Sequence, residues 1–242
     1  MVRILGFKSI FLFVYAIIVA AQILEPILVF KDRESAINTV TAMAKADTEK
    51  TEFDVMIDEK IIRISNLTLN EEKNLKKRWS AETAQVGALW TEYHSAEQGL
   101  YKSDLRPASC VHLNGHGASP YLVALTRAAS YDGSWKTGFN PDFAMLTSLH
   151  LGHEVAKKNT VSETGWYTVP AYGYGQVWLE QIVVWQNQQR RICTMHAYGT
   201  GGISCDPWSA TMRGDLPVVN GVHFVWNTDW QKMDFKNCGG GS

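Results

Sequence analysis

The sequence predicts an α+β fold with a mainly antiparallel β C-terminal half, stabilised by disulfides and preceded by a signal peptide and a helical pro-segment. All Trp, His and Cys residues and almost all Gly residues lie after Arg78. Residues 31–78 are highly charged and lack Gly and Pro, a composition that favours helix. An apolar run opens the chain. We therefore divide the chain into a signal peptide (1–21), a pro-segment (22–78) and a mature secreted domain (79–242).

The first residues have the parts of a secretory signal. Arg3 and Lys8 give a positive start, Ile10–Ala21 is apolar throughout, and small residues precede a cleavage point after Ala21. A membrane span needs about 20 apolar residues, which this run could reach only by continuing through Glu25. We expect a secreted, extracellular protein that passes through the endoplasmic reticulum and Golgi. An uncleaved signal anchor is the alternative.

Residues 31–78 of the pro-segment carry equal numbers of acidic and basic side chains and only a modest apolar strip, too small for an independent core. Asn66 begins the only N-glycosylation sequon of the chain, so we expect a glycan there. Lys77 and Arg78 end the segment. A solvated basic patch at a helix end is one interpretation of this pair. The composition break at the same position favours the other, a processing site for a kexin-type protease.

The mature domain is rich in aromatic and β-branched residues, as strands are. Residues 176–185 and 218–226 are predicted strands, and 79–103 is more helical in character. The polar residues 187–189 are predicted to form a turn, after which 192–198 returns as the second strand of a hairpin. Arg190 and Arg191 form a second candidate processing site that would divide the domain into 79–191 and 192–242, although they lie at the start of that strand.

The four cysteines all lie in the mature domain, behind a signal peptide, so two disulfides are expected. Three pairings are possible, and spacing does not choose among them. No C-x-x-C motif is present, which argues against a structural zinc site made of thiolates. The cysteines are Cys110, Cys193, Cys205 and Cys238.

The charge balance limits the partners of the protein. The 23 basic and 24 acidic side chains nearly cancel, so no positive excess exists to drive nucleic-acid binding by counterion release. We expect no nucleic-acid partner and no cofactor.

The order of these parts resembles the yeast killer preprotoxins, secreted toxins encoded on double-stranded RNA satellites of totiviruses, or a chromosomal relative of them. The parts that carry the resemblance are the apolar signal, the charged segment with its sequon, the Lys77-Arg78 boundary and the cysteine-bearing C-terminal portion. The resemblance implies a toxin that binds the cell wall of sensitive yeasts, through a receptor that is expected to be a polysaccharide. It further implies that the toxin kills by disrupting plasma-membrane permeability and that the precursor protects its producer. No catalytic motif is carried over.

Two other functions remain open. Two histidine pairs have spacings that could ligate a metal, and with Glu154 or Asp142 they could activate water in a secreted hydrolase or nuclease. Gly115 and Gly152 argue against well-formed helices that would present both rings of a pair. The third candidate is a secreted wall-binding module without lethal activity. The paired histidines are His112 with His116 and His150 with His153.

Overall fold

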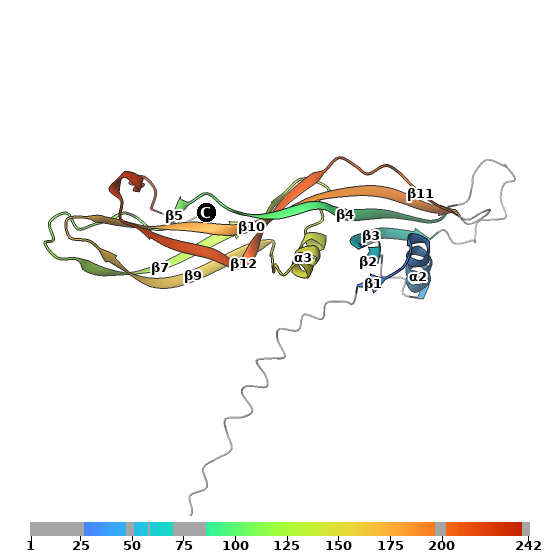
Figure 1. Ribbon diagram of the computed structural model, residues 1–242, viewed down its shortest axis with the longest axis horizontal. Coiled ribbons are helices and arrows are strands. Elements are labelled where there is room, and N and C mark those ends of the chain that lie inside the picture. The colour runs from blue at the N-terminus through green and yellow to red at the C-terminus, as the bar shows by residue number, and fades with distance from the viewer. Residues whose placement is uncertain (1–26, 47–50, 58, 70–85, 197–201, 239–242) are drawn as a thin grey trace, which may run out of the picture.

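The computed structural model describes residues 27–46, 51–57, 59–69, 86–196 and 202–238. The molecule is long and narrow, and the strand β10 (Tyr174–His196) runs through most of its length (Figure 1). We call the end where β10 begins the far end, formed by residues 106–125, 163–178 and 222–238. The opposite end is the head, formed by residues 27–69, 86–94 and 189–208 as far as these are described.

Ten strands form the main sheet, and the strand β10 lies at its centre. On one side β10 pairs with β4 (Val86–Lys102), which is followed by β3 (Lys60–Leu69), β2 (Phe53–Ile57) and β1 (Leu28–Val29). On the other side β10 pairs with β12 (Met212–Asn227), which carries the short β8 (Ser134–Trp135). The short strands β5 (Arg106–Pro107), β6 (His112–Leu113) and β11 (Ile203–Cys205) also pair with β10. All described pairs are antiparallel except β1 with β2.

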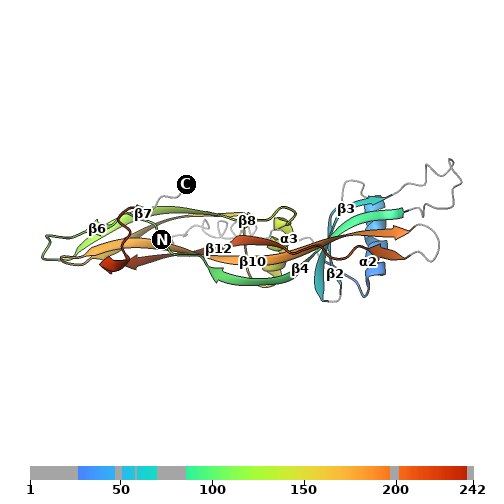
Figure 2. The ribbon, with the colours of Figure 1, turned by 90° about the horizontal axis from the view of Figure 1, so that it is seen from above.

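The head has a core that the pro-segment and the mature domain share. In the helix α2 (Arg33–Ala46) the side chains of Ala36, Ile37 and Val40 lie on one face and are fully buried. They pack over the alternating apolar side chains of β2 and β3, and Trp90 and Cys193 of the mature domain belong to the same cluster. Figure 2 shows α2 beside the sheet at this end. The segment 27–69 is thus a structural part of the head.

The expected α+β fold with a helical pro-segment is wrong, because the described chain is mostly β-sheet with two α-helices. Within the pro-segment only α2 is helical, and β1, β2 and β3 make up most of the rest that is described. Phe53, Val55 and Ile57 alternate with the less buried Asp54 and Met56 and are buried on one face, which is strand periodicity. Burial against a sheet outweighs the helix propensity of the charged neighbours. The helical character expected for 79–103 is likewise wrong, since 86–102 is the strand β4.

The turn predicted at residues 187–189 is also absent, because β10 continues through it, with a register shift against β4 between Asn187 and Gln188. Buried glutamines in this stretch are satisfied from other elements. Gln186 Nε2 donates to the side-chain oxygens of Gln98, at 2.9 Å, and of Thr147, at 2.7 Å. Gln188 exchanges two hydrogen bonds with the backbone of Asn140. Gln188, which the sequence predicts to lie in a turn, is therefore a buried residue of the strand β10.

Asn140 also caps the second helix, α3 (Pro141–His150), by accepting a hydrogen bond from the Phe143 amide at 3.0 Å. Ala144 of this helix packs with Val184 and Leu216 in a second core near the middle of the molecule.

A second sheet of two strands, β7 (Tyr121–Asp132) and β9 (Lys158–Val169), lies along β12 (Figure 1). Arg127 of β7 points inward and is buried between the rings of Tyr167 and Phe224, with its guanidinium carbon 4.6 and 4.3 Å from their centroids. No described helix is long and apolar enough to cross a membrane.

Candidate functional site

Exposed aromatic side chains concentrate at the far end. Four described aromatic residues are more than half exposed, and all four belong to this end: Trp166 (71%), Tyr172 (65%), Trp230 (63%) and Phe235 (63%). Two aliphatic side chains, Leu113 and Leu122, are exposed in the same region. We call these six residues the aromatic end. Apolar side chains gathered on a surface typically mark a contact with a membrane or another molecule.

Strand alternation turns Trp166 outward. Its neighbour Tyr167 faces inward and stacks on Trp226 with a centroid distance of 4.8 Å. The Trp226 indole donates to the Thr168 carbonyl at 3.1 Å. These inward contacts fix the strand, and since successive residues point to opposite faces, Trp166 is presented to solvent.

Two further members of the aromatic end, Tyr172 and Trp230, lie on short turns that are held by hydrogen bonds. Tyr172 has a φ of 54° in the turn before β10, and its amide donates to the Gly117 carbonyl at 3.1 Å. Trp230 begins the short helix η2 (Trp230–Lys232), where the Asp229 side chain accepts from the Gln231 amide. The surface is therefore carried by a rigid frame.

The C-terminal tail is fixed to the far end by polar bonds and by a disulfide. Gln176 of β10 is fully buried, donates to the backbone carbonyl of Asp234 at 3.0 Å and accepts from its amide at 2.8 Å. The disulfide Cys110–Cys238 joins the tail to the segment that precedes β6. These links keep Phe235 in place beside Tyr174, whose ring it meets edge-on at 5.9 Å.

The second disulfide, Cys193–Cys205, joins β10 to β11 in the head. Glu92 lies close enough to both sulfurs to form a possible metal-binding trio. Because the two sulfurs are bonded to each other, they are not available as thiolate ligands. This trio is the only such group among the described residues.

The four histidines of the hydrolase alternative lie in two separate regions. His112 is in β6 at the far end, where burial lowers the pKa of its imidazole, and His116 follows in the next loop. His150 ends α3, and His153 comes three residues later. The Asp142 carboxylate is paired with Lys157 at 2.8 Å. The described structure does not assemble these residues into one site.

The candidate processing residues Ala21, Lys77 and Arg78 lie outside the described residues. Arg190 and Arg191 lie inside β10, paired with β4, and Arg191 also binds the Glu92 carboxylate at 3.1 Å. A protease needs an extended, accessible chain, so this pair is shielded while the sheet is intact.

The sequon residue Asn66 is exposed, with a φ of 56°, at a register shift between β3 and β4. A glycan could therefore be attached without displacing the core.

The aromatic end was not recognised as a site in the sequence analysis. Its six members are scattered from residue 113 to residue 235, and they share one end of the molecule only once the chain is folded. Trp166, which begins a Trp-Tyr pair after a glycine, was the one available signal.

No protein-family model matches this chain, and no curated protein matches its sequence. Among solved structures, the chain can be superimposed on parasporin-2, a Bacillus thuringiensis toxin described as recognising cancer cells. The identity is 13%, the TM-score is 0.23, and 58% of this chain and 75% of that one are covered. A protein of Bacteroides vulgatus described as a candidate pore-forming toxin gives 9% identity and a TM-score of 0.28 over 57% of this chain and 56% of its own. The chain thus spans little more than half the length of the second protein. Scores this low support no conclusion about the fold or the activity of this chain.

Proposed function

We propose that the protein is a secreted toxin that binds the surface of sensitive yeast cells and disrupts the permeability of their plasma membrane. The observation that carries this proposal is the aromatic end. Trp and Tyr side chains favour the membrane–water boundary, where an apolar ring and a polar edge are both accommodated. The yeast target and the secretory route come from the resemblance to killer preprotoxins.

The composition of the aromatic end favours a membrane over a polysaccharide as its partner. Trp and Tyr rings stack on sugars, but Leu113 and Leu122 have no flat face to offer and gain most from burial among acyl chains. Burial of each such side chain contributes about 1.5–3 kcal/mol. We propose that these residues enter the outer leaflet together and disturb lipid packing there.

Processing after Arg78 has a different consequence in this fold from simple removal of the pro-segment. The segment 27–69 contributes most of the head core, including Ile37, Val55 and Ile64, which are all fully buried. We propose that a cut after Arg78 leaves both pieces together, held by this core.

The test is dye release from phosphatidylcholine vesicles after addition of the pure secreted protein. We expect release within minutes. The double variant Trp166→Ser, Trp230→Ser should bind vesicles roughly a hundredfold more weakly, since two apolar side chains no longer enter the lipid. Trp135→Ser is the matched control, because Trp135 is also exposed but lies on β8 near the middle of the molecule.

Vesicle binding without dye release would overturn the toxin proposal and favour the wall-binding module. Equal losses for the double variant and for the Trp135 control would show that the aromatic end is not the contact surface.

A further inference from the structure

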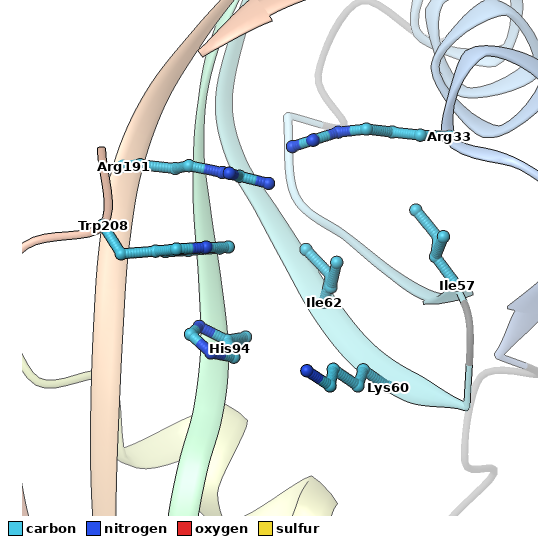
Figure 3. A pocket seen from close by; sticks show the side chains of 7 residues that line it. All are labelled: Arg33, Ile57, Lys60, Ile62, His94, Arg191 and Trp208. Atoms are coloured by element: carbon cyan, nitrogen blue, oxygen red, sulfur yellow. The ribbon is translucent and has the colours of Figure 1, made fainter. Parts of the chain in front are cut away.

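The head contains a pocket of about 230 Å³ that lies at the opposite end of the molecule from the aromatic end. Six elements or connections line it: α2, β2 and β3 from one side, and β4, β10 and the segment after β11 from the other (Figure 3). Its lining combines basic and aromatic side chains with two isoleucines, and it includes no acidic residue. The lining residues are Arg33, Ile57, Lys60, Ile62, His94, Arg191 and Trp208.

Stacked side chains form one wall of the pocket. The Arg191 guanidinium carbon lies 3.9 Å from the Trp208 ring centroid, and the His94 ring lies on Trp208 with a centroid distance of 4.1 Å. Figure 3 shows Trp208 between the other two side chains, with its edge toward Ile62. The stack holds the guanidinium plane still, which lowers the entropy lost when it binds a ligand.

A buried carboxylate fixes the two arginines. Glu92 is fully buried and binds both Arg33 and Arg191, and it also accepts a hydrogen bond from the Trp90 indole at 3.0 Å. Glu92 lies outside the pocket lining. One negative charge therefore faces the two guanidinium groups from beneath, and donors on both arginines remain for a ligand.

Two further nitrogen atoms of the lining, Lys60 Nζ and His94 Nδ1, lack an ion-pair or hydrogen-bond partner among the described residues. Among the described residues Lys60 makes no ion pair, and the buried His94 Nδ1 has no hydrogen-bond partner. Burial and the charges of Lys60 and Arg191 lower the pKa of His94, so its ring is neutral near pH 7. The charges of Arg33, Arg191 and Lys60 exceed that of Glu92, so the pocket region has a net positive charge. Its lining offers hydrogen-bond donors and no carboxylate that would accept from them.

We propose that this pocket binds the phosphate or sulfate group of a saccharide on the target-cell surface, with Arg33, Arg191 and Lys60 holding the anion. Guanidinium groups bind such tetrahedral oxyanions through paired hydrogen bonds. Ile57 and Ile62 give the pocket an apolar side that suits the C–H face of one sugar ring. The volume lies below that of pockets for drug-sized ligands, so one ring and its anionic group fill it.

This inference rests on the proposed function, because it names the chemistry of the surface receptor. The aromatic end and the pocket then have separate tasks, lipid contact and receptor recognition. Four of the seven lining residues belong to the segment 27–69, so the pocket exists only while that segment remains in the head.

Isothermal titration of the full-length secreted chain with glucose 6-phosphate tests the pocket. We expect saturable binding of glucose 6-phosphate, much weaker binding of inorganic phosphate and none of glucose. Lys60→Met keeps the side-chain stem, and it should weaken the binding of glucose 6-phosphate about tenfold because one charged hydrogen bond is lost. Lys60→Arg should retain the binding. Lys136→Met is the control, since Lys136 is exposed and makes no ion pair among the described residues.

Three outcomes would overturn the proposal. The first is no binding of glucose 6-phosphate, and the second is equal losses for Lys60→Met and Lys136→Met. The third is equal affinity for inorganic phosphate, which leaves an anion site without saccharide recognition. Binding that depends on Lys60 but occurs only to vesicles containing phosphoinositides would assign the site to a lipid headgroup and reject the saccharide.

Dye release from phosphatidylcholine vesicles is measured alongside. If dye release fails while the sugar phosphate binds, the proposed function fails and the pocket stands.

Discussion

The two ends of this molecule combine apolar and polar residues in opposite ways. The head buries its apolar side chains around α2 and presents a basic pocket to solvent. The far end exposes its large apolar side chains and buries polar links, such as Gln176 and its bonds to the C-terminal tail. The two ends therefore differ in what they expose, which is a basic pocket at the head and large apolar side chains at the far end. The comparison indicates that mutations which destabilise the head differ in kind from those which remove activity at the far end.

The largest expected effect is on a chain that begins at Trp79. Without the segment 27–69, the side chains of Ala88, Trp90 and Cys193 lose their apolar cover. We expect the head to lose its folded structure, which costs more than about 5 kcal/mol and so exceeds the margin of many domains. Hydrogen exchange should show unprotected amides over residues 86–94 and retained protection over 176–181.

The matched control is the full chain cut at Arg78 after folding. Its head should keep the protection of the uncut chain, and the released segment should co-purify with the rest. Equal protection of residues 86–94 in the chain that begins at Trp79 would contradict the shared core.

The next largest expected effect is the loss of stability on removing a disulfide, and it differs between the two disulfides. Cys110–Cys238 closes a sequence separation of 128 residues and Cys193–Cys205 one of 12. Loop entropy then predicts a loss of about 5 kcal/mol for replacing the first pair by alanine and about 3 kcal/mol for the second. Urea unfolding of the two double variants measures this difference. A larger loss for the head pair would mean that burial of Cys193 outweighs chain entropy.

The smallest expected effect is a pH dependence confined to the head. His94 faces Lys60 on β3 and Arg191 on β10, while Glu92 lies on its own strand, and the sum of these charges with burial lowers its pKa below 6.5. A bound anion opposes this shift and favours the imidazolium. Binding of glucose 6-sulfate, whose charge is constant in this range, should therefore tighten by a few-fold between pH 7.5 and pH 5.5.

His94→Gln is the variant that checks the origin of this dependence, since it should bind with the same affinity at both pH values. Dye release from phosphatidylcholine vesicles should not follow the same pH profile, because His94 lies in the head, at the opposite end of the molecule from the aromatic end. A pH dependence that survives in His94→Gln would assign it to another group.

Local patterns in the sequence predicted some elements of both ends. The strands at 176–185 and 218–226 were expected, because β-branched and aromatic residues dominate them. The charged segment was expected to be helical, which is wrong for most of its described part, because α2 is followed there by the strands β2 and β3. The expected disulfides form within the four cysteines, and the structure selects one of the three pairings.

Features that depend on distant partners could not be predicted. Gln188 was predicted to lie in a turn because its partner, the Asn140 backbone, is 48 residues away in sequence and leaves no local signal. The pocket joins side chains from residue 33 to residue 208 across the predicted boundary at Arg78. A boundary drawn from composition alone separates the two halves of this site.

The length of β10 determines how far apart lipid contact and receptor recognition take place. A strand of 23 residues rises about 75 Å at 3.3 Å per residue, many times the Debye length of about 8 Å in physiological salt. Charges in the head therefore do not act on the aromatic end. With the aromatic end in a bilayer and its long axis upright, the molecule holds its basic pocket about 56 Å beyond the start of β10, since Arg191 follows Tyr174 by 17 residues at about 3.3 Å per residue. That reach sets the depth of the polysaccharide layer in which the protein can bind a receptor while it touches the membrane.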